Sequence, residues 1–427
     1  MPDRKCLRKW RTRLANLGLR LAPKTDVPAQ WTARKGPYQF VGKRNANQKE
    51  DLWFGDNRTD PVTGLPKRNL IERPYPAVVP KPSPNALSSE SQGALARHKR
   101  HPIRNPTMKA LRTPDSRFEG LDGYPFEPHY IDVTNPDGGE SLRMHYIDEG
   151  PRDGKLVMLL HGEPTWSYLY RKMIPGLVKA GHRVIAPDQI GFGRSDKPTE
   201  QSDYSVARHV AWIRECIVKL DVQDATFFGQ DWGSLIGFTA VLHEESRFRA
   251  IVAANAALPD PSNMDRMAAA LTGSKDSEAF SRWQDWAAAQ DHMDVGKSLA
   301  EGLAGVGMGG SMDLSQAEID AYDSPFPDAS YQAGVLVFPS LIQPEKLIPD
   351  GLALFNEAWR VLEKWEKPFV TAYGLADPVL GWFAPVFQQY VPGAKGQPHR
   401  EFPNGPHFIQ EAEADALVET ILAAATA

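Results

Sequence analysis

The sequence predicts an α/β fold, in which a mostly parallel sheet carries helices on both faces, on the strength of two observations. Short, continuous apolar runs recur after Leu156, and each closes on Gly, Asp, Asn or Ala, which is typical of strands buried on both faces. Helical patterns separate these runs. This alternation favours a parallel sheet, with catalytic groups at the carboxyl ends of its strands.

The chain begins with a basic segment, residues 1–107. It holds 22 of the 49 Lys and Arg residues, only 8 of the 53 Asp and Glu residues, and 13 of the 36 prolines. We interpret it as a mostly disordered or loosely attached extension. The alternatives are a start codon assigned too far upstream, and a basic amphipathic helix at residues 7–21 that touches anionic lipid or nucleic acid.

Residues 108–260 are predicted to form the first part of the α/β core. Its strands are the apolar runs "KLVMLLHG" (155–162), "HRVIAPD" (182–188), "DATFFGQD" (224–231) and "RAIVAANA" (249–256). Between the second and third runs, Val210, Ile213 and Ile217 repeat at helical spacing, and Ser205 is placed to cap that helix.

Residues 261–335 are predicted to form a helical cap, because they are rich in Ala, Met, Trp and Asp and contain no convincing strand pattern. The strand rhythm resumes with "KPFVTAYG" (367–374), so residues 336–427 are expected to complete the same sheet. A cap inserted between two halves of one sheet explains this order better than a separate C-terminal domain does.

The composition excludes several classes of protein. The 427 residues are 41% hydrophobic and 24% charged, which is ordinary for a globular chain. No apolar run approaches the ~18 residues of a membrane span, and no signal-peptide pattern is present. The two cysteines, Cys6 and Cys216, lie far apart and outside any metal-ligand spacing, so we expect a reducing cytoplasm and no disulfide scaffold.

Three polar residues follow strands in a diagnostic order. "ATFFGQDWGSLIGFTAVL" (225–242) reads as a strand, a sharp turn and a helix, the setting of the nucleophile elbow G-x-S-x-G, with Asp231 in place of the serine. Asp377 follows the strand pattern at 367–374, and His407 lies near the C-terminus. The order nucleophile, acid, histidine is that of the α/β-hydrolase triad, and we expect that fold, with an eight-stranded sheet.

The aspartate at the elbow indicates attack on a saturated carbon. A serine would form an ether there, whereas a carboxylate forms an ester that water can hydrolyse. A carboxylate is also ionised near pH 7 and needs no base for its attack. His407 is then required only to deprotonate water in the second step, with Asp377 orienting it. The backbone N–H groups of Trp232 and Glu163 are the expected oxyanion donors.

Tryptophans are expected to bind the leaving group. Trp232 follows the nucleophile directly, and an indole N–H donates without accepting, which suits a departing anion. The segment "FSRWQDW" in the cap offers Trp283 and Trp286. Most tryptophans serve in core packing, and we keep that interpretation for Trp286 but not for Trp232 or Trp283.

The chain resembles the haloalkane dehalogenases, and within them the subfamily of the 1,2-dichloroethane-type enzymes. The segments that carry the resemblance are "HGEPTWSYLYRKMIP" (161–175), "VIAPDQIGFGRSDKP" (184–198), "GQDWG" (229–233), "SPFPDASYQAG" (324–334) and "HFIQE" (407–411), and it runs from about Met108 to the C-terminus. It implies Asp231 as nucleophile, His407 as base, Asp377 as acid, and Trp232 and Trp283 as the halide pair.

The resemblance also implies other features of the site. Phe280, Phe326, Pro327, Val379 and Leu380 would line the substrate pocket. The reaction would be hydrolysis of a haloalkane to a primary alcohol, halide and a proton, without metal or organic cofactor. We expect a small-molecule substrate, no nucleic acid partner, and a monomer. Some family members carry the acid after the sixth strand, where this chain has Asn255, which cannot serve.

Two residues depart from the family pattern. Ser234 stands where the family commonly has a second glycine, and it is small enough for close helix packing. Pro406 replaces the glycine usually found before the histidine. Because proline fixes φ and lacks an N–H, the position of His407 is the weaker part of the triad assignment.

Two other functions compete with this interpretation. An epoxide hydrolase shares the aspartate elbow and needs two acidic donors in its lid, for which Tyr322 and Tyr331 are available. "HGEPTW" and Trp232 favour the dehalogenase. A non-catalytic binding protein on the same fold, with the basic extension as its working part, would have no physical reason to keep three polar groups at strand ends.

Overall fold

The computed structural model describes most of the chain after the basic extension. It covers residues 108–426, apart from 136–138, most of 261–277, 303–311 and most of 344–349, together with five short strands between residues 19 and 68. Thr107–Ala427 belong to one compact unit, and Arg8–Pro106 form another.

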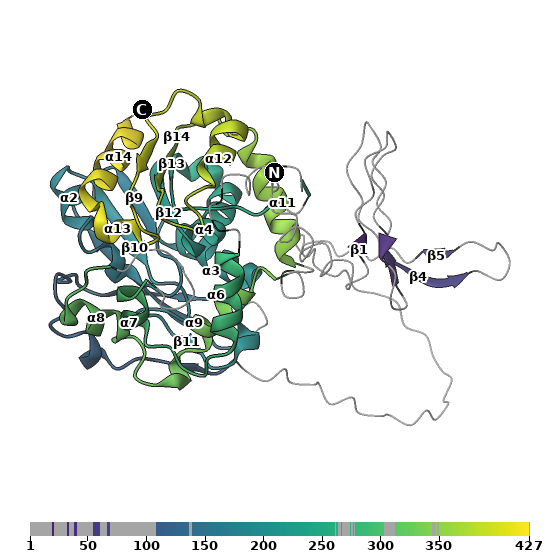
Figure 1. Cartoon of the computed structure of the whole chain (residues 1–427), viewed down its shortest axis with the longest axis horizontal. Coiled ribbons are helices and arrows are strands. Elements are labelled where there is room, and N and C mark those ends of the chain that lie inside the picture. The colour runs from purple at the N-terminus through teal and green to yellow at the C-terminus, as the bar shows by residue number, and fades with distance from the viewer. Residues whose placement is uncertain are drawn as a thin grey trace, which may run out of the picture. The chain divides into compact units, whose positions relative to one another are not determined.

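The first unit is built on an eight-stranded sheet among the described residues (Figure 1). From one edge to the other, its strands are β15 (Arg400–Phe402), β14 (Phe369–Gly374), β13 (Phe248–Ala254), β12 (Ala225–Gln230), β9 (Leu156–Leu160), β10 (Arg183–Pro187), β8 (Leu142–Glu149) and β7 (His129–Val133). The strands from β15 to β10 run parallel, while β8 and β7 pair antiparallel at the other edge. The mainly parallel sheet confirms the predicted fold class.

The central strands are buried on both faces. Every residue of β9, β12 and β14 is buried, as expected for continuous apolar runs in a parallel sheet. All five predicted runs contain a strand of the sheet. In contrast, β7 and β8 mix buried with half-exposed residues and carry charged side chains, so no apolar run marks them in the sequence.

Helices cover both faces of the sheet. On one face, α3 (Val206–Lys219) and α11 (Asp350–Leu362) pack against α4 (Trp232–His243), which lies on β12 and β9. On the other face lie α2 (Ile174–Lys179) and α14 (Ala414–Thr426), as Figure 1 shows. Ser205 caps α3 by accepting a hydrogen bond from the Arg208 N–H at 3.2 Å, which confirms the predicted N-cap.

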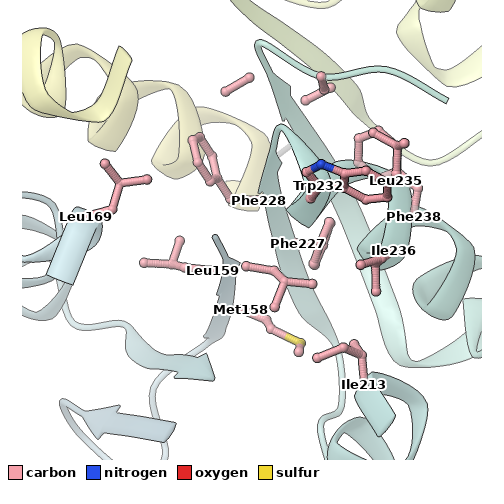
Figure 2. Packing of buried hydrophobic residues seen from close by; sticks show 14 of the residues in the cluster. Met158, Leu159, Leu169, Ile213, Phe227, Phe228, Trp232, Leu235, Ile236 and Phe238 are labelled. Carbon is pink, nitrogen blue, oxygen red and sulfur yellow. The ribbon is translucent and has the colours of Figure 1, made fainter. Parts of the chain in front are cut away.

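Apolar packing fixes α4 against the sheet. Figure 2 shows side chains of β9 and β12, including Met158 and Phe227, gathered beside Ile236 and Phe238 of the helix. The Phe227 and Phe238 rings meet edge to face, 5.9 Å between centroids. Because α4 is buried along almost its whole length, its first residue has a fixed position at the end of β12.

Helices occupy the chain between β13 and β14. They include α6 (Ala279–Ala288), α7 (Val295–Ala300), α8 (Gln316–Asp323) and α9 (Ala333–Val337), and no strand appears among the described residues of this section. In Figure 1 they gather beyond one end of the sheet. The helical section continues through α11, past the predicted cap boundary at residue 335, and the limits 261–335 stay a prediction.

The second unit contains five short strands that the sequence did not predict. β1 (Leu19–Arg20) pairs antiparallel with β2 (Thr32–Ala33), and β3 (Tyr38–Phe40), β4 (Phe54–Thr59) and β5 (Pro66–Arg68) form a three-stranded antiparallel sheet. The predicted disorder of residues 1–107 and the alternative helix at 7–21 otherwise fall outside the described residues. In the described part of the chain, no helix is long and apolar enough to cross a membrane.

Candidate active site

Asp231 lies on a strained turn between β12 and α4. Its backbone has φ 52° and ψ −130°, in a region that residues other than glycine rarely adopt. Two residues later, a Cβ on Gly233 would lie 2.0 Å from the Leu160 carbonyl oxygen, so only glycine lets α4 approach β9 this closely. The turn is therefore a sharp elbow, as predicted, and it presents a carboxylate.

The turn after β9 contacts the Asp231 carboxylate through its backbone. The Glu163 N–H donates to Asp231 Oδ1 at 2.9 Å. A Cβ on Gly162 would lie 2.3 Å from the same oxygen, so glycine allows the turn to reach it. Trp232 is the first residue of α4, and the helix provides no acceptor for its backbone N–H. Of the two predicted oxyanion donors, Trp232 thus follows Asp231 in the chain, and the Glu163 N–H contacts its carboxylate.

The structure brings the three predicted triad residues together. His407 Nδ1 lies 2.9 Å from Asp377 Oδ2, and His407 Nε2 lies 3.5 Å from Asp231 Oδ2. The other Asp377 oxygen accepts hydrogen bonds from the N–H groups of Val379 and Leu380, at 2.8 and 3.2 Å. The imidazole therefore bridges two buried carboxylates, one of which is held rigidly by backbone donors.

This position strongly favours the charged form of His407. Burial lowers its pKa, but the Asp377 and Asp231 carboxylates outweigh that effect and raise the pKa to about 10. The raised pKa favours the imidazolium form of His407 at neutral pH.

Asn255 holds the loop that carries His407. Its side-chain Nδ2 donates to the carbonyl oxygens of Pro406 and His407, at 2.8 and 2.9 Å, and its Oδ1 accepts from the Gly374 N–H at 2.7 Å. Proline lacks an N–H but keeps its carbonyl, so Pro406 takes part in this clamp. The departure at Pro406 is thus accommodated in the structure.

Ser234 also makes specific contacts in place of the usual glycine. Its Oγ donates to the Asp231 carbonyl at 2.5 Å and accepts from the Ala257 N–H at 3.1 Å. These bonds tie the first turn of α4 to the segment after β13, close to Asn255.

The two predicted halide tryptophans are both buried. Trp232 is 2% exposed, and its ring meets that of Phe338 at 5.0 Å. Trp283, on α6, is 1% exposed and stacks on Trp286 at 5.1 Å. The indole of Trp283 hydrogen-bonds to the side chain of Glu163, the residue whose N–H contacts Asp231. Glu163 thus links Trp283 to the elbow at Asp231.

Comparisons with known proteins agree with this geometry. The family model of the α/β hydrolase fold matches residues 155–293. A haloalkane dehalogenase of Psychrobacter cryohalolentis is 45% identical over 318 residues, which cover 74% of this chain and 97% of the relative. One of Mycobacterium marinum is 44% identical over 317 residues, which cover 74% of this chain and 99% of the relative. The chain belongs to the haloalkane dehalogenase family.

A solved haloalkane dehalogenase has the same architecture. The tetrameric enzyme DpaA of Paraglaciecola agarilytica superposes with a TM-score of 0.61 at 36% identity, covering 74% of this chain and 97% of its own. The resemblance inferred from sequence motifs is therefore confirmed, for the family and for the fold.

The residues predicted to line the dehalogenase pocket differ in their exposure. Phe326 and Val379 are buried, Phe280 and Leu380 are half-buried, and Pro327 is exposed. Val379 and Leu380 lie at the site through their hydrogen bonds to Asp377. Their role as pocket lining stays a prediction.

Of the two tyrosines that an epoxide hydrolase could use, Tyr322 has a different hydrogen-bond partner in this dehalogenase. The Tyr322 hydroxyl, on α8, donates to a Glu411 carboxylate oxygen. Tyr331 lies in a short 3-10 helix (Ala329–Tyr331) and is half-buried. Because the Tyr322 hydroxyl is bonded to Glu411, it is not directed to an epoxide oxygen, which agrees with the dehalogenase interpretation.

Two side chains of this dehalogenase site were not predicted. Asn255 was identified only as unable to act as the acid, and its clamp on His407 was missed. Gln230, directly before Asp231, donates from Nε2 to the His407 carbonyl at 3.2 Å, and this Nε2 lies 3.4 Å from His407 Nε2. A polar residue at the end of a buried strand is the signal that could have identified both.

Proposed function

We propose that this dehalogenase hydrolyses carbon–halogen bonds through a covalent ester on Asp231. The observation that carries the proposal is the position of His407, with Nε2 3.5 Å from Asp231 Oδ2 and Nδ1 2.9 Å from Asp377. A histidine held beside a buried nucleophilic carboxylate and oriented by a second carboxylate is suited to activate water.

In the first step, Asp231 displaces the halide. Its Oδ1 accepts the Glu163 N–H, so Oδ2 is the oxygen proposed to attack the halogen-bearing carbon. A carbon–oxygen bond forms, the carbon–halogen bond breaks, and the halide leaves with the bonding electrons. The indole N–H groups of Trp232 and Trp283 are the proposed donors to the departing anion.

In the second step, His407 Nε2 takes a proton from water as the water oxygen attacks Cγ of Asp231. The negative charge that develops on Oδ1 is stabilised by the N–H groups of Glu163 and Trp232. The Cγ–O bond to the substrate then breaks, the departing oxygen takes the proton of the added hydroxyl to give the alcohol, and the Asp231 carboxylate is restored. The sum is haloalkane plus water giving alcohol, halide and one proton.

The first step prepares His407 for the second. The Asp231 carboxylate contributes to the raised pKa of His407 in the resting enzyme. Esterification removes that negative charge, so the pKa of His407 falls and the imidazole can release a proton and serve as the base.

Halide release from 1,2-dibromoethane and 1-bromobutane tests this function, with His407→Phe as the matched variant. The parent is expected to release halide catalytically, and the variant about one equivalent per active site, because its ester is not hydrolysed. No halide from either protein, together with hydrolysis of styrene oxide, would contradict the proposal.

A single turnover in ¹⁸O-labelled water tests the ester itself. Because water attacks Cγ of Asp231, the label is expected in the protein and not in the first alcohol released. Label in that first alcohol would mean that water attacks the substrate carbon directly.

We also propose that the enzyme is a cytoplasmic monomer that takes small haloalkanes as substrates. The buried free thiol of Cys216 supports a reducing compartment. Light scattering of the purified chain distinguishes a monomer from a tetramer such as that of the Paraglaciecola enzyme.

A further inference from the structure

Glu163 has a buried side-chain carboxyl group, and the two proposed steps use only the backbone N–H of this residue. Its side chain is 3% exposed, and Oε1 has no hydrogen-bond partner among the described residues. Burying a polar atom without a hydrogen bond costs free energy, so the unpaired Oε1 calls for an explanation. Its main chain is fixed, because the N–H donates to Asp231.

The partner of this carboxyl group is the indole of Trp283. An indole nitrogen carries one proton and cannot accept, so Trp283 donates and Glu163 accepts. Trp283 is 1% exposed and stacked on Trp286, so its ring is confined. Its single N–H therefore points at Glu163 in the resting structure, while the proposed function requires the same N–H for the halide.

We propose that Glu163 and the departing halide compete for the N–H of Trp283, so that Glu163 is a positioning residue that controls how tightly halide is held and how fast it leaves. The inference rests on the halide-binding role of Trp283 in the proposed function. When the halide forms, the indole N–H of Trp283 donates to the halide instead of to Glu163. When Glu163 accepts the indole N–H of Trp283 again, it replaces the halide as the acceptor and favours halide release.

The surroundings of Glu163 suit this exchange. Because Oε1 has no partner among the described residues, the carboxyl group can turn away from Trp283 without breaking a hydrogen bond at that oxygen. Burial and the Asp231 carboxylate raise the pKa of Glu163 well above its usual range, although the Trp283 hydrogen bond and the His407 charge lower it. A neutral carboxyl group still accepts from the indole through its carbonyl oxygen, and it does not repel the halide as an anion would.

Bromide binding to the full chain, measured by tryptophan fluorescence and stopped-flow kinetics, tests the proposal. Glu163→Met removes the competing acceptor, so bromide is expected to bind roughly three- to tenfold more tightly and to dissociate more slowly, as loss of one competing hydrogen bond implies. Glu163→Gln keeps an acceptor oxygen and should restore the parental affinity.

A double-mutant cycle with Trp283→Phe assigns the effect to the indole. Trp283→Phe alone is expected to weaken bromide binding, and adding Glu163→Met to it should change nothing further. Gln284→Met is the matched control on α6, because Gln284 donates to the Pro339 carbonyl at 2.6 Å rather than to the Trp283 pair. It should leave bromide affinity unchanged.

Several outcomes would overturn the inference. These are weaker bromide binding by Glu163→Met, the same shift in the Trp283→Phe background, or the same shift in Gln284→Met. Thermal unfolding of every variant identifies a loss of fold. Failure of the proposed function looks different, since the parent would then bind no bromide and release none from 1-bromobutane.

Discussion

Asp231 and His407 are coupled electrostatically, and the coupling links the two halves of the reaction. His407 is held between two carboxylates, and both contribute to its pKa of about 10 against an ordinary value of 6.5. The proposed nucleophile therefore contributes to the protonation state of the proposed base. The proposed ester changes this state at the moment when a base is required.

Asp231→Asn is expected to lower the pKa of His407 from about 10, because it removes one of the two carboxylates and leaves the opposing effect of burial. NMR titration of the His407 ring in the parent and the variant measures this shift. An unchanged pKa would mean that Asp377 alone keeps His407 charged.

The raised pKa of His407 also makes the unfolding free energy depend on pH. Because the pKa of His407 is raised from 6.5 to about 10, its ionisation stabilises the folded chain fully below pH 6.5, and this contribution is lost as the pH rises through about 10. In Asp231→Asn the loss is complete at a lower pH, which urea unfolding between pH 6 and 10 would show.

Asn255 offers a second test at the scale of one residue. Asn255→Ala removes three hydrogen bonds and places alanine at φ 36°, so we expect a loss of about 2–4 kcal/mol in unfolding free energy. Asn255→Gly removes the same bonds without the backbone strain and should lose less. Because the clamp positions His407, both variants should slow ester hydrolysis more than halide formation in a single turnover.

The clustering of Asp231, Asp377 and His407 could be predicted because each follows a recognisable strand or motif. The clamp around His407 could not. Asn255 and Pro406 lie 151 positions apart, and their contact depends on how β13 and the C-terminal loop meet in space. The sequence showed Pro406 as a departure, but only the structure reveals that its carbonyl is an acceptor.

At the scale of elements, a buried charge cluster joins α8 to the core. Arg171 donates to Glu411 at 2.5 and 3.0 Å and to Glu318 of α8, and the Tyr322 hydroxyl donates to Glu411 as well. The guanidinium also lies 4.1 Å from the Tyr168 ring centroid. The cluster thus connects a helix of the predicted cap with α13 (Ile409–Ala412), just after His407.

Arg171→Met is expected to lower the unfolding free energy by about 3 kcal/mol, because it leaves Glu411 buried with fewer partners. The neighbouring Lys172 also pairs with Glu411, at 2.7 Å, but its side chain is 39% exposed. Lys172→Met should therefore cost about 1 kcal/mol or less. Urea unfolding compares the two variants, and equal losses would contradict the importance of the buried Arg171.

The elements differ in how far they could be predicted. Strands buried on both faces appear as unbroken apolar runs, so β9, β10, β12, β13 and β14 were all identified. The three strands at or next to the sheet edges were not. β7 and β8 combine apolar with charged residues, as in "LRMHYIDE", and β15 has only three residues. β7 and β15 are edge strands with one neighbour each, and β8 lies next to the edge between β10 and β7; partial exposure to water there relaxes the demand for apolar side chains.

At the scale of the whole molecule, the proposed site residues all come from one part of the chain. Every proposed catalytic and halide-binding residue lies between Glu163 and His407, inside the unit Thr107–Ala427 with its own core. The relatives match about three quarters of this chain but nearly all of their own length. The extension is therefore an addition to a family-sized enzyme.

A chain that begins at Met108 should keep the kcat and KM of the full chain for 1-bromobutane. Halide release by the two purified proteins, side by side, measures this. The comparison with full-length His407→Phe ensures that the activity comes from the proposed site. Loss of activity on truncation would show that the extension takes part in folding or catalysis.

The fixed position of the Asp231 carboxylate also has a stereochemical consequence. Oδ1 is held by Glu163, so the proposed attack comes from Oδ2, in line and opposite to the carbon–halogen bond. The substrate carbon is inverted once, and water later attacks Cγ of Asp231 rather than that carbon. A single enantiomer of 2-bromobutane should therefore give 2-butanol of the opposite configuration, whereas retention would mean that water displaced the carboxylate at the substrate carbon of the ester.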